Sequence, residues 1–544
     1  HPLYRLLDGN VAALRQANIL ITFGLATLTA GAVLSSVVPS RPLGLVPRTV
    51  IALGLASGAL ALFSTWLPTP SYNSLNLQSL LVAATGLAWS CSDRVSTQLR
   101  GQLLVGAGGW LAFMAKPSTA LALGVFVLLF WLLTRRLSLR GLLISVATAT
   151  LLLMGSALWI DGSIDAFASR LTTGLEVAGQ LGGGHTITNV LRMDAFKLKV
   201  QEQTLFFTLA ALVFAWIQLL SSQRFAGRAL GAVTAGAAVL FVILWTAGVV
   251  EDDLKLGKFQ NLLYAAISLA ALLTALARWL RRLGGPAPVP ARALLPLLAM
   301  PVLAYAYAFG TNGNYWSTSA FAAFFWLMPS LVLASSTDER HDPVFSLVPL
   351  VLATQVITVV VLQTGMERPY RQMQPLRLNN HAVDFGQPGS TLMLSGPYAD
   401  YLNAATGTAQ AAGLAPGTPM IDLSGQSPGI LYALQAESLG LAWMIGGYPG
   451  SARLATFALA SVPCEKLAQA WVLSEPGGPR SLSEEVLGAF GADITAHYQQ
   501  VGAWMTAAGA GRNLNPRRQM LWKPVRNPMH AQQACESARN KGSL

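Results

Sequence analysis

A lysine–proline pair inside a long apolar run is the feature of this sequence best suited to chemistry. Lys116 and Pro117 interrupt the run Leu103–Leu133. About 20 apolar residues cross a membrane, so a run of this length must fold back on itself. Proline lacks a backbone N–H and disfavours helix in the residue before it. We therefore predict a turn at Lys116-Pro117, with almost no loop.

This turn would hold one ammonium group between two helices, with no acidic residue close in sequence. One interpretation is a lysine that anchors a helix end by extending its charge to the membrane surface. The other is a phosphate site, because an unpaired lysine at this depth is costly unless an anion binds it.

Composition places the pair in a membrane protein. The 544 residues are 53% hydrophobic and 11% charged, whereas soluble domains are nearer about 25% charged. The net charge of +12 does not indicate nucleic-acid binding, because most Arg and Lys residues lie in short loops beside apolar runs, where they set topology.

Window length and flanking helix breakers predict twelve membrane spans within residues 1–365. They are Ala17–Val38, Val50–Leu67, Leu77–Ser90, Gln102–Ala115, Ser118–Leu133, Gly141–Ile160, Thr204–Leu220, Ala229–Val250, Gln260–Ala277, Ala293–Phe309, Ser319–Ser335 and Val344–Leu362.

The arginines assign the sides of the membrane. Alternate loops are rich in arginine, as at Arg135, Arg136 and Arg140, and cytoplasmic loops carry such an excess. The opposite loops, including the one with Lys116, therefore face outward. In the outward loop before Asn76, Tyr72 and Asn73 are candidate hydrogen-bonding groups for a polar substrate.

Two further outward loops carry charge. The loop Asp161–Gln203 begins with apolar residues at helical spacing, which predicts an amphipathic helix in the interface. Its polar residues include the substrate-binding candidate His185, and the next outward loop contributes acidic residues. The weak candidates for a general base are Asp161, Glu251 and Asp252.

Residues 366–544 have a different composition, with short strand-like segments between turns and one helical segment, Ser481–Phe490. We predict a compact α/β domain outside the membrane. Cys464 and Cys535 both fall in it, and an extracytoplasmic compartment permits a disulfide between them. Two buried free thiols are the alternative.

Taken together, the membrane block and the soluble domain resemble the GT-C superfamily of polytopic glycosyltransferases, in particular bacterial aminoarabinose transferases and protein O-mannosyltransferases. The stretch that carries the resemblance is Pro2-Leu3-Tyr4, followed by Arg15 entering the next helix. In that family a similar stretch closes the first outward loop, after a first span and the catalytic carboxylate. The resemblance thus implies that both precede His1, and that Tyr4 contacts substrate.

The resemblance implies a mainly α fold and a glycosyltransferase of the bacterial inner membrane. Its donor would be a sugar on polyprenyl phosphate, transferred with inversion to a lipid, glycan or protein acceptor. A carboxylate would deprotonate the acceptor, and cations would hold the leaving phosphate. The candidate phosphate ligands are Lys116, Arg170, Arg192, Lys197 and Lys199.

Two other classes remain open: a transporter or flippase of a lipid-linked or anionic solute, and a non-catalytic membrane scaffold. A transporter favours charged residues near the midplane and internal repeats, and the predicted spans contain neither. The sequence contains no phosphate-binding loop, dinucleotide fingerprint or metal-spaced Cys/His cluster. It predicts no cofactor, and the need for a divalent metal stays open.

Overall fold

The computed structural model describes residues 2–37, 44–180, 191–192, 194–195, 198–250, 260–281, 299–335 and 344–542. Contacts divide the chain into two compact units. The helical unit comprises residues 15–160 and 185–367, and the C-terminal unit comprises residues 1–14, 161–184 and 368–544. The predicted fold class, mainly α with a small C-terminal α/β part, is confirmed.

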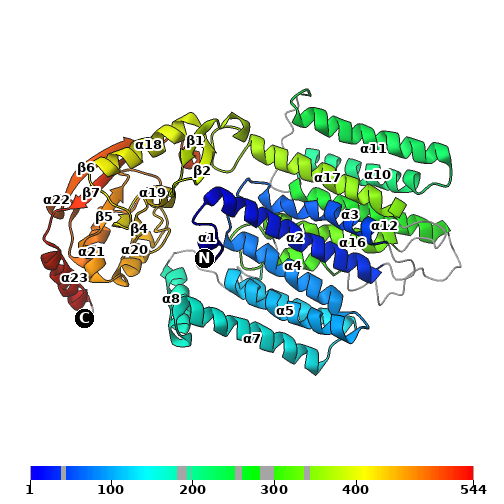
Figure 1. The fold of residues 1–544 in the computed structure, drawn as a ribbon, viewed down its shortest axis with the longest axis horizontal. Coiled ribbons are helices and arrows are strands. Elements are labelled where there is room, and N and C mark those ends of the chain that lie inside the picture. Colours follow the sequence, from blue (N-terminus) through cyan, green and yellow to red (C-terminus); the bar gives the residue numbers. More distant parts are fainter. Residues whose placement is uncertain are drawn as a thin grey trace. The chain divides into compact units, whose positions relative to one another are not determined.

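The helical unit consists of long helices that lie roughly alongside one another (Figure 1). Its elements are α2 (Val11–Val37, of which the first turn falls in the other unit), α3 (Leu45–Ala56), η1 (Ser57–Phe63), α4 (Tyr72–Ser90), α5 (Val95–Ala115), α6 (Pro117–Leu133), α7 (Leu139–Asp161), α10 (Val200–Leu220), α11 (Phe225–Thr246), η2 (Gln260–Leu262), α12 (Leu263–Arg281), α14 (Pro301–Ala308), α15 (Tyr315–Ser319), η3 (Ala320–Ala322), α16 (Phe324–Ser335) and α17 (Val344–Glu367).

Among the described residues, seven helices are long and apolar enough to cross a membrane: α2, α3 with η1, α7, α10, α11, α12 and α17. An eighth crossing is formed if the pair Tyr315–Ala322 and Phe324–Ala334, bent by 63°, counts as one span. These eight coincide with eight of the twelve predicted spans. The other four predicted spans correspond to α4, α5, α6 and α14, which do not meet the same length and composition test.

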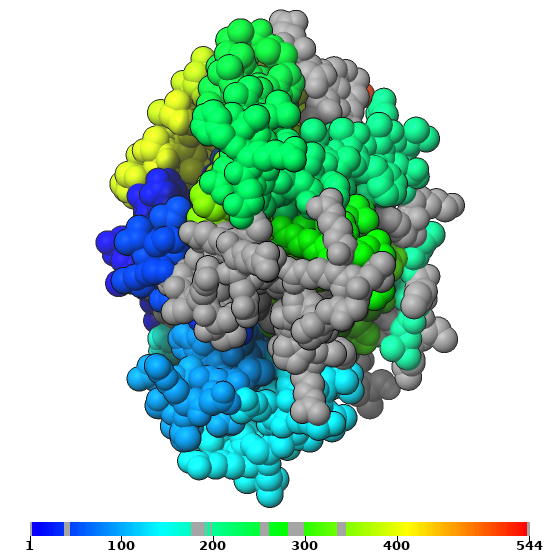
Figure 2. Space-filling view, turned by 90° about the vertical axis from the view of Figure 1, so that its right-hand side faces the viewer, coloured from blue at the N-terminus to red at the C-terminus, as the bar shows by residue number. Residues whose placement is uncertain are grey.

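The periphery of the helical unit is apolar and exposed, as a lipid-facing surface should be. In Figure 2, α11 (green) and the segment from α5 to α7 (light blue to cyan) lie at opposite ends of one face. Only 17% of the most apolar window of α7, and 17% of that of α11, is buried inside the protein. Exposed side chains such as Leu151 and Leu240 would be unfavourable in water and are favourable in lipid.

The predicted fold-back at Lys116 is confirmed, because α5 ends at Ala115 and α6 begins at Pro117. The far end of α6 returns to the start of α5. There Trp131 Nε1 donates to Ser90 Oγ at 3.0 Å, and the α6–α7 turn is joined to the α4–α5 turn by an ion pair, Arg136 to Asp93 at 2.6 Å. The arginine-rich turns therefore meet at one end of these helices, and the Lys116 turn lies at the other.

Helices α4 and α5 form a tightly packed antiparallel pair. A Cβ atom on Gly86 would lie 2.7 Å from the backbone oxygen of Gly101, and one on Gly108 would lie 2.8 Å from the Ala83 Cβ. Only glycine permits the two backbones to approach so closely. This packing places the start of α4 beside the end of α5, where Lys116 follows.

The C-terminal unit contains a five-stranded sheet of order β4-β3-β5-β7-β6, in which β4, β3 and β5 are parallel. Its elements are α1 (Pro2–Leu6), α8 (Ile164–Gln180), η4 (Leu376–Leu378), β1 (His381–Asp384), β2 (Thr391–Leu394), α18 (Gly396–Ala411), β3 (Pro419–Asp422), α19 (Pro428–Ala433), β4 (Glu437–Ser438), α20 (Ser451–Ala460), α21 (Cys464–Ala468), β5 (Trp471–Ser474), η5 (Glu484–Phe490), α22 (Ile494–His497), β6 (Tyr498–Met505), η6 (Ala510–Arg512), β7 (Arg518–Pro524) and α23 (Pro528–Gly542).

Alternating side chains give this sheet two apolar faces. Met420 and Leu473 pack with α18 and α19 on one face, whereas Ile421 and Val472 pack with α20, α21 and η5 on the other. A disulfide between Cys464 and Cys535 joins α21 to α23 inside the second core.

The first prediction concerns topology. In a background with Cys91 replaced by alanine, cysteines at Ser138 and Asn403 are expected to react with a membrane-impermeant maleimide from opposite sides of the membrane. Both positions are exposed, and the arginine alternation assigns them to opposite sides. Labelling of both from the same side in intact cells would contradict the topology.

The second prediction concerns the disulfide, which joins residues 71 positions apart in the chain. A cross-link over a loop of this length stabilises by roughly 4 kcal/mol in the chain-entropy description. The double variant Cys464→Ala/Cys535→Ala should therefore unfold its C-terminal unit at a clearly lower temperature than the wild-type protein, as measured by differential scanning calorimetry. Cys91→Ala is the control, and equal melting of all three proteins would contradict the prediction.

Candidate functional site

The candidate site surrounds Lys116, at the end of the helical unit opposite the arginine-rich turns. Lys116 is the single residue between α5 and α6, and its extended backbone (φ −162°, ψ 102°) reverses the chain. Because α5 ends directly before Lys116 and α6 begins directly after it, the positions of these two helices fix the position of its Cα atom.

The Lys116 ammonium points to the C-terminal end of α14. Its Nζ lies 3.4 Å from the backbone oxygen of Tyr307 and 3.4 Å from that of Ala308. A helix C-terminus carries a partial negative charge, which favours a cation. These distances exceed the about 2.7–2.9 Å of a strong charge-assisted bond, so the contacts are weak.

Burial lowers the pKa of Lys116 to about 8. No carboxylate in the part of the chain that the structure describes lies within ion-pair distance of this ammonium. A half-buried cation held only by carbonyl oxygens gains strongly from a bound anion. This is the chemical character that the sequence predicted for a phosphate site.

The turn after α14 completes one wall of the site. Ser118 Oγ donates to the Phe309 backbone oxygen at 2.9 Å, and the Gly310 N–H donates to Tyr315 Oη at 3.0 Å. Gly310 has a left-handed backbone (φ +75°), and a Cβ there would lie 2.6 Å from Ser118 Oγ. A glycine is therefore required for the chain to pass this close to the Lys116 turn.

Arg192 and Asp194, which precede α10, form contacts with the turn that follows α14. Arg192 donates to Asp194 at 2.9 Å and to the Gly313 backbone oxygen at 2.7 Å, and its guanidinium lies 4.9 Å from the Tyr315 ring centre. The Tyr315 N–H, 2.7 Å from Asp194, and Arg192 hold the pKa of Asp194 below its usual range. Arg192 thus links Asp194 to the turn after α14. Its assignment to the donor phosphate stays a prediction.

Three other substrate and phosphate candidates of the helical unit are described, and all three lie at its surface. Tyr72 and Asn73 begin α4 and are exposed, with Tyr72 61% accessible. Lys199 is exposed and precedes α10. Lys197 and His185 lie outside the described residues.

Three candidates belong to the C-terminal unit. Tyr4 lies in α1, where its hydroxyl is 3.2 Å from that of Tyr432. Arg170 donates to both oxygens of Asp161, at 2.7 and 3.0 Å. Because both carboxylate oxygens accept from a guanidinium, Asp161 is poorly suited to act as a base in this arrangement.

Sequence reasoning did not single out Glu202 as a candidate base. Glu202 is buried in the first turn of α10, where one oxygen accepts from the Lys199 N–H at 2.8 Å and the other has no hydrogen-bond partner among the described residues. A carboxylate three residues after a helix start is a common cap, so its position in the sequence carries no functional signal. Glu251 and Asp252 lie outside the described residues.

Asn76 was also missed, because the sequence prediction places it at the end of an outward loop, directly before the span Leu77–Ser90, where a polar amide carries no functional signal. It is 1% exposed and donates through Nδ2 to the Tyr307 backbone oxygen at 3.1 Å. Lys116, the residue that follows α5, contacts the same oxygen. Polar groups from α4, from the end of α5 and from α14 therefore meet at the Tyr307 carbonyl.

The C-terminal unit has a buried polar cluster of its own, at the carboxyl ends of β3 and β5. Glu475 accepts from Arg517 at 2.6 Å and from Gln519 at 2.8 Å, and Asp422 accepts from the Ser424 hydroxyl at 2.6 Å. These groups satisfy one another, which is what a structural polar core requires. Among the described residues no cluster of three or more His, Cys, Asp or Glu side chains suits a metal ion.

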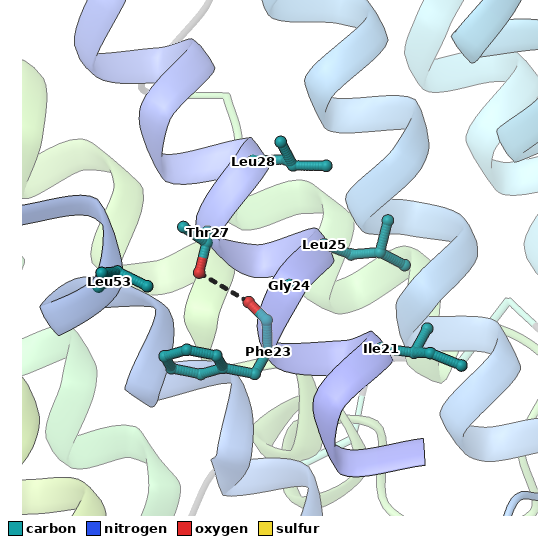
Figure 3. A pocket seen from close by; sticks show the side chains of 7 residues that line it. All are labelled: Ile21, Phe23, Gly24, Leu25, Thr27, Leu28 and Leu53. Carbon is teal, nitrogen blue, oxygen red and sulfur yellow. Dashed lines mark hydrogen bonds between the residues drawn. The ribbon is translucent and has the colours of Figure 1, made fainter. Parts of the chain in front are cut away.

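An apolar groove of about 510 Å³ runs along α2 beside Leu53 of α3 (Figure 3). The remaining lining residues all come from α2: Ile21, Phe23, Gly24, Leu25, Thr27 and Leu28. The Thr27 hydroxyl donates to the Phe23 backbone oxygen at 2.9 Å, so the lining offers no free side-chain donor to a ligand. The groove therefore lacks the donors needed to bind a phosphate.

No protein-family model matches the chain, and no curated protein is similar to it in sequence. Among solved structures, the crystal structure of ArnT from Cupriavidus metallidurans in the apo state aligns with 92% of this chain and 83% of its own. The identity is 11% and the TM-score is 0.32. A similarity of this size does not establish a common fold.

The third prediction is a pH dependence of anion binding. A folded pKa of about 8 means that Lys116 is mostly charged at pH 7 and mostly neutral at pH 9. Affinity for a phosphodiester lipid, whose charge is constant over this range, should fall by up to about tenfold per pH unit above 8. Lys116→Arg should show no such fall, because arginine stays charged. The same decline in both proteins, measured by lipid titration in detergent, would contradict the prediction.

Proposed function

We propose that the protein is a membrane glycosyltransferase that uses a sugar linked to polyprenyl phosphate. The observation that carries the proposal is the Lys116 ammonium, half-buried at the end of the helical unit and bonded only weakly to carbonyl oxygens. A bound phosphate would stabilise such a cation more than it would stabilise a lysine that anchors a helix end, because the charge of an anchoring lysine is already hydrated.

At the anomeric carbon, the proposed reaction forms one bond and breaks one. The acceptor hydroxyl oxygen attacks the anomeric carbon, the bond from that carbon to the phosphate oxygen breaks, and the electron pair leaves with polyprenyl phosphate. Lys116 stabilises the negative charge that grows on the leaving phosphate. The acceptor proton passes to a carboxylate.

Glu202 is the described carboxylate of the helical unit best suited to take that proton. It is buried and one oxygen lacks a partner, whereas both oxygens of Asp194 accept hydrogen bonds. The candidates Glu251 and Asp252 remain alternatives.

The site is proposed to face the outer side of a bacterial inner membrane, because the arginine-rich turns at the opposite end are typical of the cytoplasmic side. The long apolar helices suit a lipid-linked donor that stays in the bilayer. The acceptor can be a lipid, a glycan or a protein.

The fourth prediction tests this proposal with Lys116→Met, which keeps the side-chain length and removes the charge. Transfer from a polyprenyl-phosphate sugar should fall by roughly 10²–10³, the scale for losing one group that stabilises developing negative charge. Lys116→Arg should recover only part of the rate, because a planar guanidinium occupies a different volume from an ammonium.

Lys466→Met is the matched control. It removes an exposed lysine, ion-paired to Glu437 in the C-terminal unit, and should leave transfer unchanged. Rates are normalised to folded protein in detergent. Turnover near the wild-type value in Lys116→Met would leave this residue as a helix anchor and refute the proposal.

A further inference from the structure

Two side-chain donors meet at a single backbone oxygen in the candidate site. The Tyr307 oxygen lies 3.1 Å from Asn76 Nδ2 and 3.4 Å from Lys116 Nζ. An ammonium and an amide N–H around one oxygen are also a suitable arrangement for a phosphate oxygen. The carbonyl at the end of α14 thus occupies the position that an anion's oxygen would take.

The other polar atom of Asn76 is unused. Its Oδ1 has no hydrogen-bond partner among the described residues, and water does not reach it, because the side chain is only 1% exposed. The amide orientation is fixed, because a carbonyl oxygen such as that of Tyr307 can only accept. Oδ1 is therefore an acceptor that a phosphate oxygen cannot satisfy, and it needs an O–H or N–H group.

Together the two donors and the unused acceptor suit a phosphate that carries a hydroxylated group beside it. We infer that Asn76 is a second contact for the lipid-linked donor. Its Nδ2 joins Lys116 on the phosphate in place of the Tyr307 carbonyl, and its Oδ1 accepts a hydrogen bond from a hydroxyl of the adjacent sugar. This inference rests on the proposed function and adds the residue that distinguishes the sugar-bearing lipid from the bare one.

Binding of the ligand requires the last turn of α14 to move aside, because its Tyr307 carbonyl contacts both donors. In the proposed complex this turn uncovers Asn76 and Lys116, while α4 and α5, whose close packing fixes both residues, stay in place.

The fifth prediction compares two lipids in Asn76→Leu, a variant of similar volume. Binding of polyprenyl phosphate without sugar should weaken about 2–10-fold, because one hydrogen bond is lost. Binding of the sugar-linked lipid should weaken about 5–100-fold, because two are lost. The preference for the sugar-linked lipid should therefore shrink, as measured by titration of both lipids into purified protein.

Asn261→Leu is the matched control. Asn261 is 2% exposed, donates through Nδ2 to the Ala61 backbone oxygen at 3.1 Å, and has an unpartnered Oδ1. The substitution thus removes the same kind of buried amide elsewhere in the helical unit, and both affinities should stay at the wild-type value.

Asn76→Asp provides a second test if the leucine variant does not fold. It keeps an acceptor oxygen, loses the N–H and adds a negative charge beside Lys116, so both lipids should bind more weakly, and the bare phosphate, which carries the greater negative charge, should weaken at least as much as the sugar-linked one. Unchanged affinities in either folded Asn76 variant, or equal losses for both lipids in Asn76→Leu, overturn the inference. If Lys116→Met also binds both lipids normally, the proposed function itself fails.

Discussion

The close packing of α4 against α5 is the constraint on which the candidate site depends. Gly86, Gly101 and Gly108 bring the two backbones so near that a methyl group at any of them would collide with the partner helix. In a membrane, where apolar side chains gain little by leaving lipid, such contact between backbones is a main source of helix association. It fixes the register of the pair, and with it the positions of Asn76 and Lys116.

The electrostatics of the site follow from this register. Lys116 is partly removed from solvent, and the partial charge of a helix end replaces a full negative charge as its partner. A carboxylate in the same place would bind the lysine strongly and compete with any phosphate. A carbonyl is weak enough to be displaced and strong enough to keep the ammonium in position.

Much of the fold could be predicted from the sequence, because apolar length and proline are strong local signals. The break at Lys116-Pro117 and the amphipathic helix from Ile164 onward are confirmed, as is the presence of short strands after residue 366, among them β2, β3 and β5. The strands β6 and β7 were not predicted, since the first contains Gly502 and two glutamines and neither alternates cleanly.

The site was harder to predict than the fold. Lys116 stood out because a charge in an apolar run is conspicuous, whereas Asn76 did not, because it ends a predicted polar loop and its burial is visible only in the structure. Its importance depends on the carbonyl of Tyr307, more than 200 positions away in the sequence. Contacts of that range leave no periodicity or spacing in the chain, so only the three-dimensional structure can reveal them.

The short helix α14 has a consequence for the release of product. In the proposed reaction the departing polyprenyl phosphate carries about −1.5 to −2 charges at pH 7, more than the diester that enters. A lysine without a competing partner would keep this phosphate bound. The tethered carbonyl at the end of α14 is present at a high effective concentration and reoccupies the ammonium whenever the phosphate loosens. The contact between Lys116 and the α14 carbonyls would thus weaken binding of the donor lipid and also shorten the lifetime of the product complex. A lower donor affinity would be accompanied by faster release of polyprenyl phosphate.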